Sequence, residues 1–70
     1  MDELQIIGRN IFNLRTAKKL SQEDLCGMAD LDRSYLSEIE NGHKNFSIMV
    51  LLKISKALEV PVEEILNTEQ

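Results

Sequence analysis

Apolar residues recur at steps of three and four along much of the chain, and this spacing most limits what the chain can fold into. The first series consists of Leu4, Ile7, Ile11 and Leu14. Residues three and four apart share one face of an α-helix, so the series predicts an amphipathic helix from about Glu3 to Lys19. No segment shows the period of two that is typical of a half-buried strand. The spacing therefore predicts an all-α fold.

A second, short helix is predicted to begin at Gln22. Ser21 has the side chain of an N-cap residue, and Asp24 stands three residues later as in a capping box. Leu20 and Leu25 stand where the two residues of a hydrophobic staple are expected. Three residues of this helix are expected to face the core: Leu25, Met28 and Ala29.

A third helix is predicted to follow after about three residues, "ADL". Asp32 is its predicted N-cap, and Leu36 and Ile39 are expected to face the core. Asn41-Gly42 provides the left-handed backbone that ends many helices. Two short helices joined by so short a connection predict a helix-turn-helix over about residues 21–42.

Two further helices complete the predicted five. After a loop, "HKNF", Ser47 is expected to cap a fourth helix. Its apolar face is predicted to comprise Val50, Leu51, Ile54, Ala57 and Leu58. Pro61 suits the first position of a short fifth helix through "PVEEIL". With 70 residues, the chain is expected to form a single domain, residues 1–70.

The charges form bands along the chain. The net charge of −4 argues against nucleic acid as a partner, because nucleic-acid binders are usually basic. Residues 1–20 and 43–58, however, carry net charges of +2 and +3, whereas residues 21–42 and 59–70 carry −5 and −4. Two positive bands therefore remain available for an anionic partner.

Other chemistries find little support in the sequence. A single cysteine and a single histidine allow neither a disulfide framework nor a metal site built from those residues, and the lone thiol suits a reducing cytoplasm. There is no glycine-rich phosphate loop and no catalytic constellation, so we expect no enzyme activity and no cofactor. No signal peptide or membrane-spanning stretch is evident. We expect no small-molecule ligand.

The outward face of the third helix is short and polar. Ser34, Ser37, Glu38 and Asn41 point away from the core, with Arg33 and Tyr35 on the flanks. A solvated helix usually carries stabilising Lys-Glu pairs, whereas serine is a poor helix former. Composition alone leaves two readings open, a plain solvated helix and a contact surface.

Residues 8–66 resemble the Cro/CI-type (lambda-repressor-like, Xre) helix-turn-helix family. The resemblance is carried by "LSQEDL", "YLSEIENG" and "LLKISKAL". The stretch "LDRSYLSEIENGHKNFS" is also similar to controller proteins of restriction–modification systems, a dimeric subgroup. The resemblance implies a sequence-specific DNA-binding transcription regulator that acts in the cytoplasm as a homodimer on a roughly palindromic operator.

The resemblance also implies roles for individual residues on double-stranded DNA. The third helix would lie in the major groove, with Arg33 as the main reader of guanine. The predicted base contacts are Arg33, Ser34, Ser37 and Glu38. The predicted backbone contacts are Gln22, Tyr35, His43, Lys44, Asn45 and Ser47. Gln22 matches a family position that touches the DNA backbone and can brace a base contact.

Arg15 and Glu40 are predicted to form a structural salt bridge. Each flanks the apolar face of its helix, so they meet if the first and third helices pack together, and the family pairs an arginine and a glutamate at these places. The predicted dimer region comprises Val62, Ile65 and Leu66. Leu58 and Ile65 can also pack inward, which leaves Val62, Leu66 or both on an apolar surface with an acidic rim.

The main alternative is an antitoxin-like or other protein-binding module on the same fold, which the acidic net charge favours. Salt dependence discriminates between the two, since DNA affinity falls steeply with salt.

Overall fold

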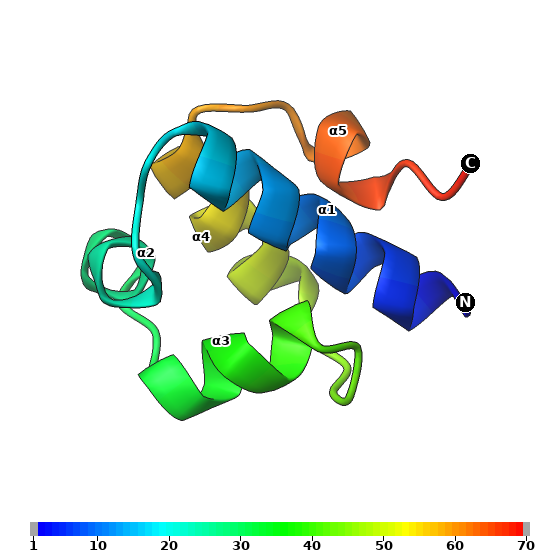
Figure 1. Ribbon diagram of the computed structural model, residues 1–70, viewed down its shortest axis with the longest axis horizontal. Coiled ribbons are helices and arrows are strands. Elements are labelled where there is room, and N and C mark those ends of the chain that lie inside the picture. The colour runs from blue at the N-terminus through cyan, green and yellow to red at the C-terminus, as the bar shows by residue number, and fades with distance from the viewer. Residues whose placement is uncertain (1, 70) are drawn as a thin grey trace.

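Five helices pack around one core in the computed structural model, which describes residues 2–69 (Figure 1). They are α1 (Glu3–Ala17), α2 (Gln22–Ala29), α3 (Arg33–Glu40), α4 (Ile48–Leu58) and α5 (Val62–Leu66). Every regular element within the described range is a helix, so the predicted all-α fold is confirmed. Helix α1 packs on α3 and α5, while α2 packs on α3 and α4.

Side-chain caps place the helix starts where the sequence predicts them. The Ser21 hydroxyl accepts from the Asp24 amide, and the Ser21 amide donates to the Asp24 carboxylate, each at 2.9 Å. The hydrogen bond from the Ser21 backbone, and then that with its side chain, lower the pKa of Asp24. Asp32 and Ser47 accept from Tyr35 and Val50 in the same manner, so α2, α3 and α4 begin as expected.

Two boundaries differ from their predictions. Helix α1 ends at Ala17 rather than near Lys19, because Lys19 adopts a left-handed backbone with φ of 60°. Pro61 precedes α5 instead of opening it, because its ψ of 150° is extended. Gly42, with φ of 75°, supplies the left-handed residue predicted after α3.

The core draws on every helix. Seven side chains have almost no exposed surface: Ile11, Leu25, Leu36, Ile39, Ile54, Leu58 and Ile65. Met28, predicted to be in the core, is 56% exposed, because α2 turns Leu25, Cys26 and Ala29 inward instead. Burial also raises the pKa of the Cys26 thiol.

Gly8 lets α1 approach α3 closely. A Cβ atom there would collide with the Ile39 carbonyl oxygen and would lie 2.7 Å from that of Glu40. Only glycine therefore fits where α1 crosses the end of α3, and this crossing sets the position of the helix-turn-helix.

Candidate nucleic-acid interface

An open hollow on the outer side of α3 brings together most of the predicted DNA-contacting residues. We call it the recognition hollow, and its lining residues are Gln22, Arg33, Ser34, Ser37, Glu38, Asn41 and His43. All four predicted base-contacting residues line it, together with two of the six predicted backbone-contacting residues. The third helix thus presents a continuous polar surface rather than scattered polar groups.

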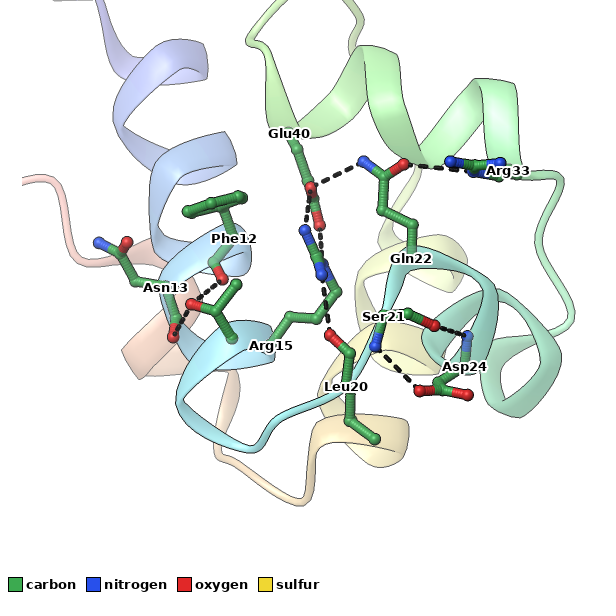
Figure 2. Close-up of polar contacts among 10 residues, drawn as sticks. Phe12, Asn13, Arg15, Leu20, Ser21, Gln22, Asp24, Arg33 and Glu40 are labelled. Atoms are coloured by element: carbon green, nitrogen blue, oxygen red, sulfur yellow. Dashed lines mark hydrogen bonds and ion pairs between the residues drawn. The ribbon is translucent and has the colours of Figure 1, made fainter.

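Arg33 stands at the first position of α3, exposed at one end of this hollow. Its Nε lies 3.5 Å from the amide oxygen of Gln22, a long hydrogen bond (Figure 2). Since this contact uses Nε, the two terminal nitrogens of the guanidinium remain available to a partner.

A buried ion pair joins Arg15 of α1 to Glu40 of α3. Arg15 Nε donates to Glu40 Oε2 at 2.7 Å, and Nη2 donates to Oε1 at 3.0 Å. Arg15 Nη1 also donates to the Leu20 carbonyl at 2.8 Å, and the guanidinium lies 5.2 Å from the centre of the Phe12 ring. The predicted pair is therefore present, and it ties α1, α3 and the turn before α2 together.

Gln22 connects this buried pair to the surface. Its Nε2 donates to Glu40 Oε1 at 3.0 Å, while its oxygen faces Arg33, as Figure 2 shows. The Gln22 side chain thus contacts both Arg33, the first residue of α3, and Glu40, its last residue.

The remaining predicted backbone contacts lie outside the recognition hollow. The ammonium of Lys44 lies 6.0 Å from the centre of the half-buried Tyr35 ring, so these two side chains form a cation–π contact beside α3. Asn45 and Ser47 are exposed, and Ser47 caps α4. The start of α4 therefore offers free backbone amides, which favour anions.

A second hollow, which the sequence did not predict, borders the first. We call it the flanking hollow; it is lined by Gln5, Arg9, Phe12, Gln22, Glu40 and Asn41. Gln5, Arg9 and Phe12 are four and three residues apart, so their common helix face was readable from the sequence. Their position beside α3 was not, because it depends on how α1 crosses the helix-turn-helix.

The predicted dimer residues differ in exposure. Ile65 is fully buried in the chain's own core, so its prediction as a dimer contact is wrong. Asn10 of α1 donates to the carbonyl oxygens of Ile65 and Asn67 at 2.9 and 2.7 Å, which holds α5 with Ile65 turned inward. Val62 is half-buried against the core, whereas Leu66 is 42% exposed. Leu52 on α4 is also 48% exposed, although the sequence did not single it out as a dimer contact.

Within residues 2–69, no group of histidine, cysteine and acidic side chains is arranged to hold a metal ion. None of the helices in this range has the length and apolar character needed to cross a membrane.

Comparison with known proteins identifies the family. The model of a family described as Helix-turn-helix, HTH_3, matches residues 11–65, most of the chain. The chain belongs to this Helix-turn-helix family. The resemblance to the Cro/CI (Xre) type is thereby confirmed, and α2 and α3 are its helix-turn-helix.

Among its relatives are proteins named as control or controller proteins. Control protein C.MunI of Mycoplasma sp is 41% identical over 96% of this chain and 93% of that protein, and control protein C.BamHI of Bacillus amyloliquefaciens is 40% identical over 89% and 78%. The crystal structure of the restriction-modification controller protein C.AhdI from Aeromonas hydrophila matches with a TM-score of 0.87 and 42% identity, over 89% of this chain and 94% of that one.

Proposed function

We propose that this helix-turn-helix protein regulates transcription as a homodimer on a roughly palindromic DNA site. Relatives of the chain are named as HTH-type transcriptional regulators, which supports DNA-binding transcription regulation. The observation that carries the proposal is the recognition hollow, which collects four candidate base-contacting side chains on the outer face of α3.

The hollow has the chemistry needed to read base edges. The two terminal nitrogens of Arg33 fit the O6 and N7 acceptors of guanine. The Glu38 carboxylate can accept from the amino group of cytosine, and the hydroxyls of Ser34 and Ser37 can donate or accept. Such short polar side chains let the helix lie close to the floor of the major groove.

The backbone contacts we propose lie in and around the hollow. Gln22 at the start of α2 borders one end of it, while Tyr35, His43, Lys44, Asn45 and Ser47 extend from α3 to the start of α4. Few of these groups are cations, so we expect modest affinity for random DNA.

A second copy of the chain is the partner that we propose for the α4–α5 end. Leu52 and Leu66 are exposed on two helices that pack against each other. A 70-residue domain buries a thin core, and a subunit contact would add to it. Two-fold pairing would place the recognition helices about 34 Å apart, one turn of DNA.

The relatives named as restriction-modification control proteins support a role in controlling such a locus. As a regulator of transcription, the protein would work in the cytoplasm, where bacterial DNA lies.

Selection from a random duplex pool tests the proposed function. We expect enrichment of a site with two related half-sites, bound by two chains and weakened as salt rises. A protein that enriches no sequence and ignores salt would overturn the proposal and favour the protein-binding alternative, which the net charge of −4 supports.

A further inference from the structure

The flanking hollow continues the recognition hollow onto α1. The two hollows share Gln22 and Asn41, so they are neighbours on one surface. Three residues of α1 line the flanking hollow and not the recognition hollow: Gln5, Arg9 and Phe12. A ligand that extends past Gln22 therefore meets α1 next.

The one acidic residue that lines this hollow, Glu40, is paired with a cation. Glu40 Oε2 accepts from Arg15 Nε, and Oε1 accepts from Arg15 Nη2 and Gln22 Nε2, at 2.7, 3.0 and 3.0 Å. Since Arg15 balances its charge, Glu40 adds little repulsion toward an anion.

Arg9 is the charged residue of the flanking hollow that lies outside the Arg15–Glu40 ion pair. It is exposed, and it makes no side-chain hydrogen bond or ion pair with another residue in the range 2–69. The flanking hollow, counted together with Arg15 behind it, therefore carries a net positive charge held by Arg9. The amides of Gln5 and Asn41 add uncharged donors beside it.

We propose that Arg9 binds a backbone phosphate of the DNA, on the strand that passes Gln22 and beyond the bases read from α3. This inference rests on the proposed function. A phosphate is a better fit than a base, because α3 occupies the major groove in this arrangement and α1 lies beside it. The planar guanidinium fork can bind two phosphate oxygens at once.

Salt titration of three variants tests the role of Arg9. Arg9→Ala should weaken the selected duplex and a random duplex by the same factor and should reduce the log–log salt slope by about 0.9 for each bound chain. Arg9→Lys keeps the charge and should keep the slope. Lys53→Ala is the matched control, because Lys53 lines a separate hollow between α2 and α4, and its slope should equal that of the wild type.

Uncharged phosphate analogues in the DNA can show which phosphate Arg9 contacts. Methylphosphonates placed one at a time along the flank of each half-site should reveal one position that weakens the wild type several-fold and leaves Arg9→Ala unaffected. Equal salt slopes for wild type and Arg9→Ala would overturn this inference alone, provided that Arg33→Ala still loses base preference. A wild type that binds no duplex would overturn the proposed function and the inference with it.

Discussion

The Gln22 amide donates to the Glu40 carboxylate, with 3.0 Å between Nε2 and Oε1, although the two residues belong to different helices of the helix-turn-helix. The same oxygen accepts from Arg15 Nη2 at 3.0 Å. Because the amide nitrogen faces the carboxylate, the amide oxygen faces Arg33. The exposed arginine of the recognition hollow is thus linked to the buried core through one side chain.

Removal of either partner of the buried pair should destabilise the fold. Arg15→Ala leaves the Glu40 carboxylate buried without its counter-ion, and Glu40→Ala does the reverse. We expect each to lower the free energy of unfolding by about 3–5 kcal/mol, measured in urea melts.

The double variant Arg15→Met/Glu40→Leu is the control for this prediction. It removes both charges and fills the space with apolar atoms, so it should be more stable than either alanine variant. Single effects near zero, or alanine effects that simply add in the double variant Arg15→Ala/Glu40→Ala, would show that the two side chains do not depend on each other.

Arg33→Ala should reduce base discrimination. Its two terminal nitrogens are free in the structure to meet a guanine, so their loss should cost roughly 1–3 kcal/mol on the selected duplex. Affinity for random duplex should change much less. Unchanged affinity for both duplexes would remove Arg33 from the base contacts.

Lys44→Ala should have a different effect. Lys44 stands beside Tyr35 outside the recognition hollow, where a cation is suited to a phosphate. Both duplexes should weaken alike, and the salt slope should fall by about one unit for each bound chain. A slope equal to that of the wild type would contradict this assignment.

Leu66→Glu and Leu52→Glu should dissociate the proposed dimer. A charge placed on the exposed apolar surface of α4 and α5 should weaken self-association by about 2 kcal/mol or more if the residue lies centrally in the interface. Sedimentation at micromolar concentration measures this. Met28→Glu is a matched control, since Met28 is 56% exposed on α2 and should leave dimerisation unchanged. A monomeric wild type would refute the placement.

Gly8→Ala and Gly27→Ala should change stability in opposite directions. A Cβ at Gly8 collides with the end of α3, so α1 must move away at a cost of roughly 1–3 kcal/mol. A Cβ at Gly27, inside α2, meets no atom within 4 Å beyond its chain neighbours and the backbone of its own helix, so alanine should stabilise that helix by about 0.5–1 kcal/mol. Thermal melts of the two variants compare them directly, and equal effects would contradict the close approach at Gly8.

Local chemistry explains what the sequence by itself determined. Ser21, Asp32 and Ser47 each accept from an amide three residues later, so the information that starts α2, α3 and α4 lies within a few residues. The apolar spacing of Ile11 and Leu36 likewise marks the faces that become buried. The outward face of α3 follows from the same period. The assignment of Arg33, Ser34, Ser37 and Glu38 as base contacts came from the resemblance to the helix-turn-helix family, because the period alone does not distinguish a contact surface from a solvated one.

Only the tertiary structure decided how these faces meet. Met28 was predicted to be buried but is exposed, because its helix turns Cys26 inward instead, and Ile65 is buried because α5 rests on α1. Gln22 and Glu40 are distant in sequence, and their hydrogen bond exists because α2 packs on α3. Helix α1, which crosses α3 at Gly8, brings Arg15 to the same carboxylate. The periodicity of a single helix gives the direction of each side chain about that helix, whereas the angle and distance between helices depend on the packing of all their side chains together.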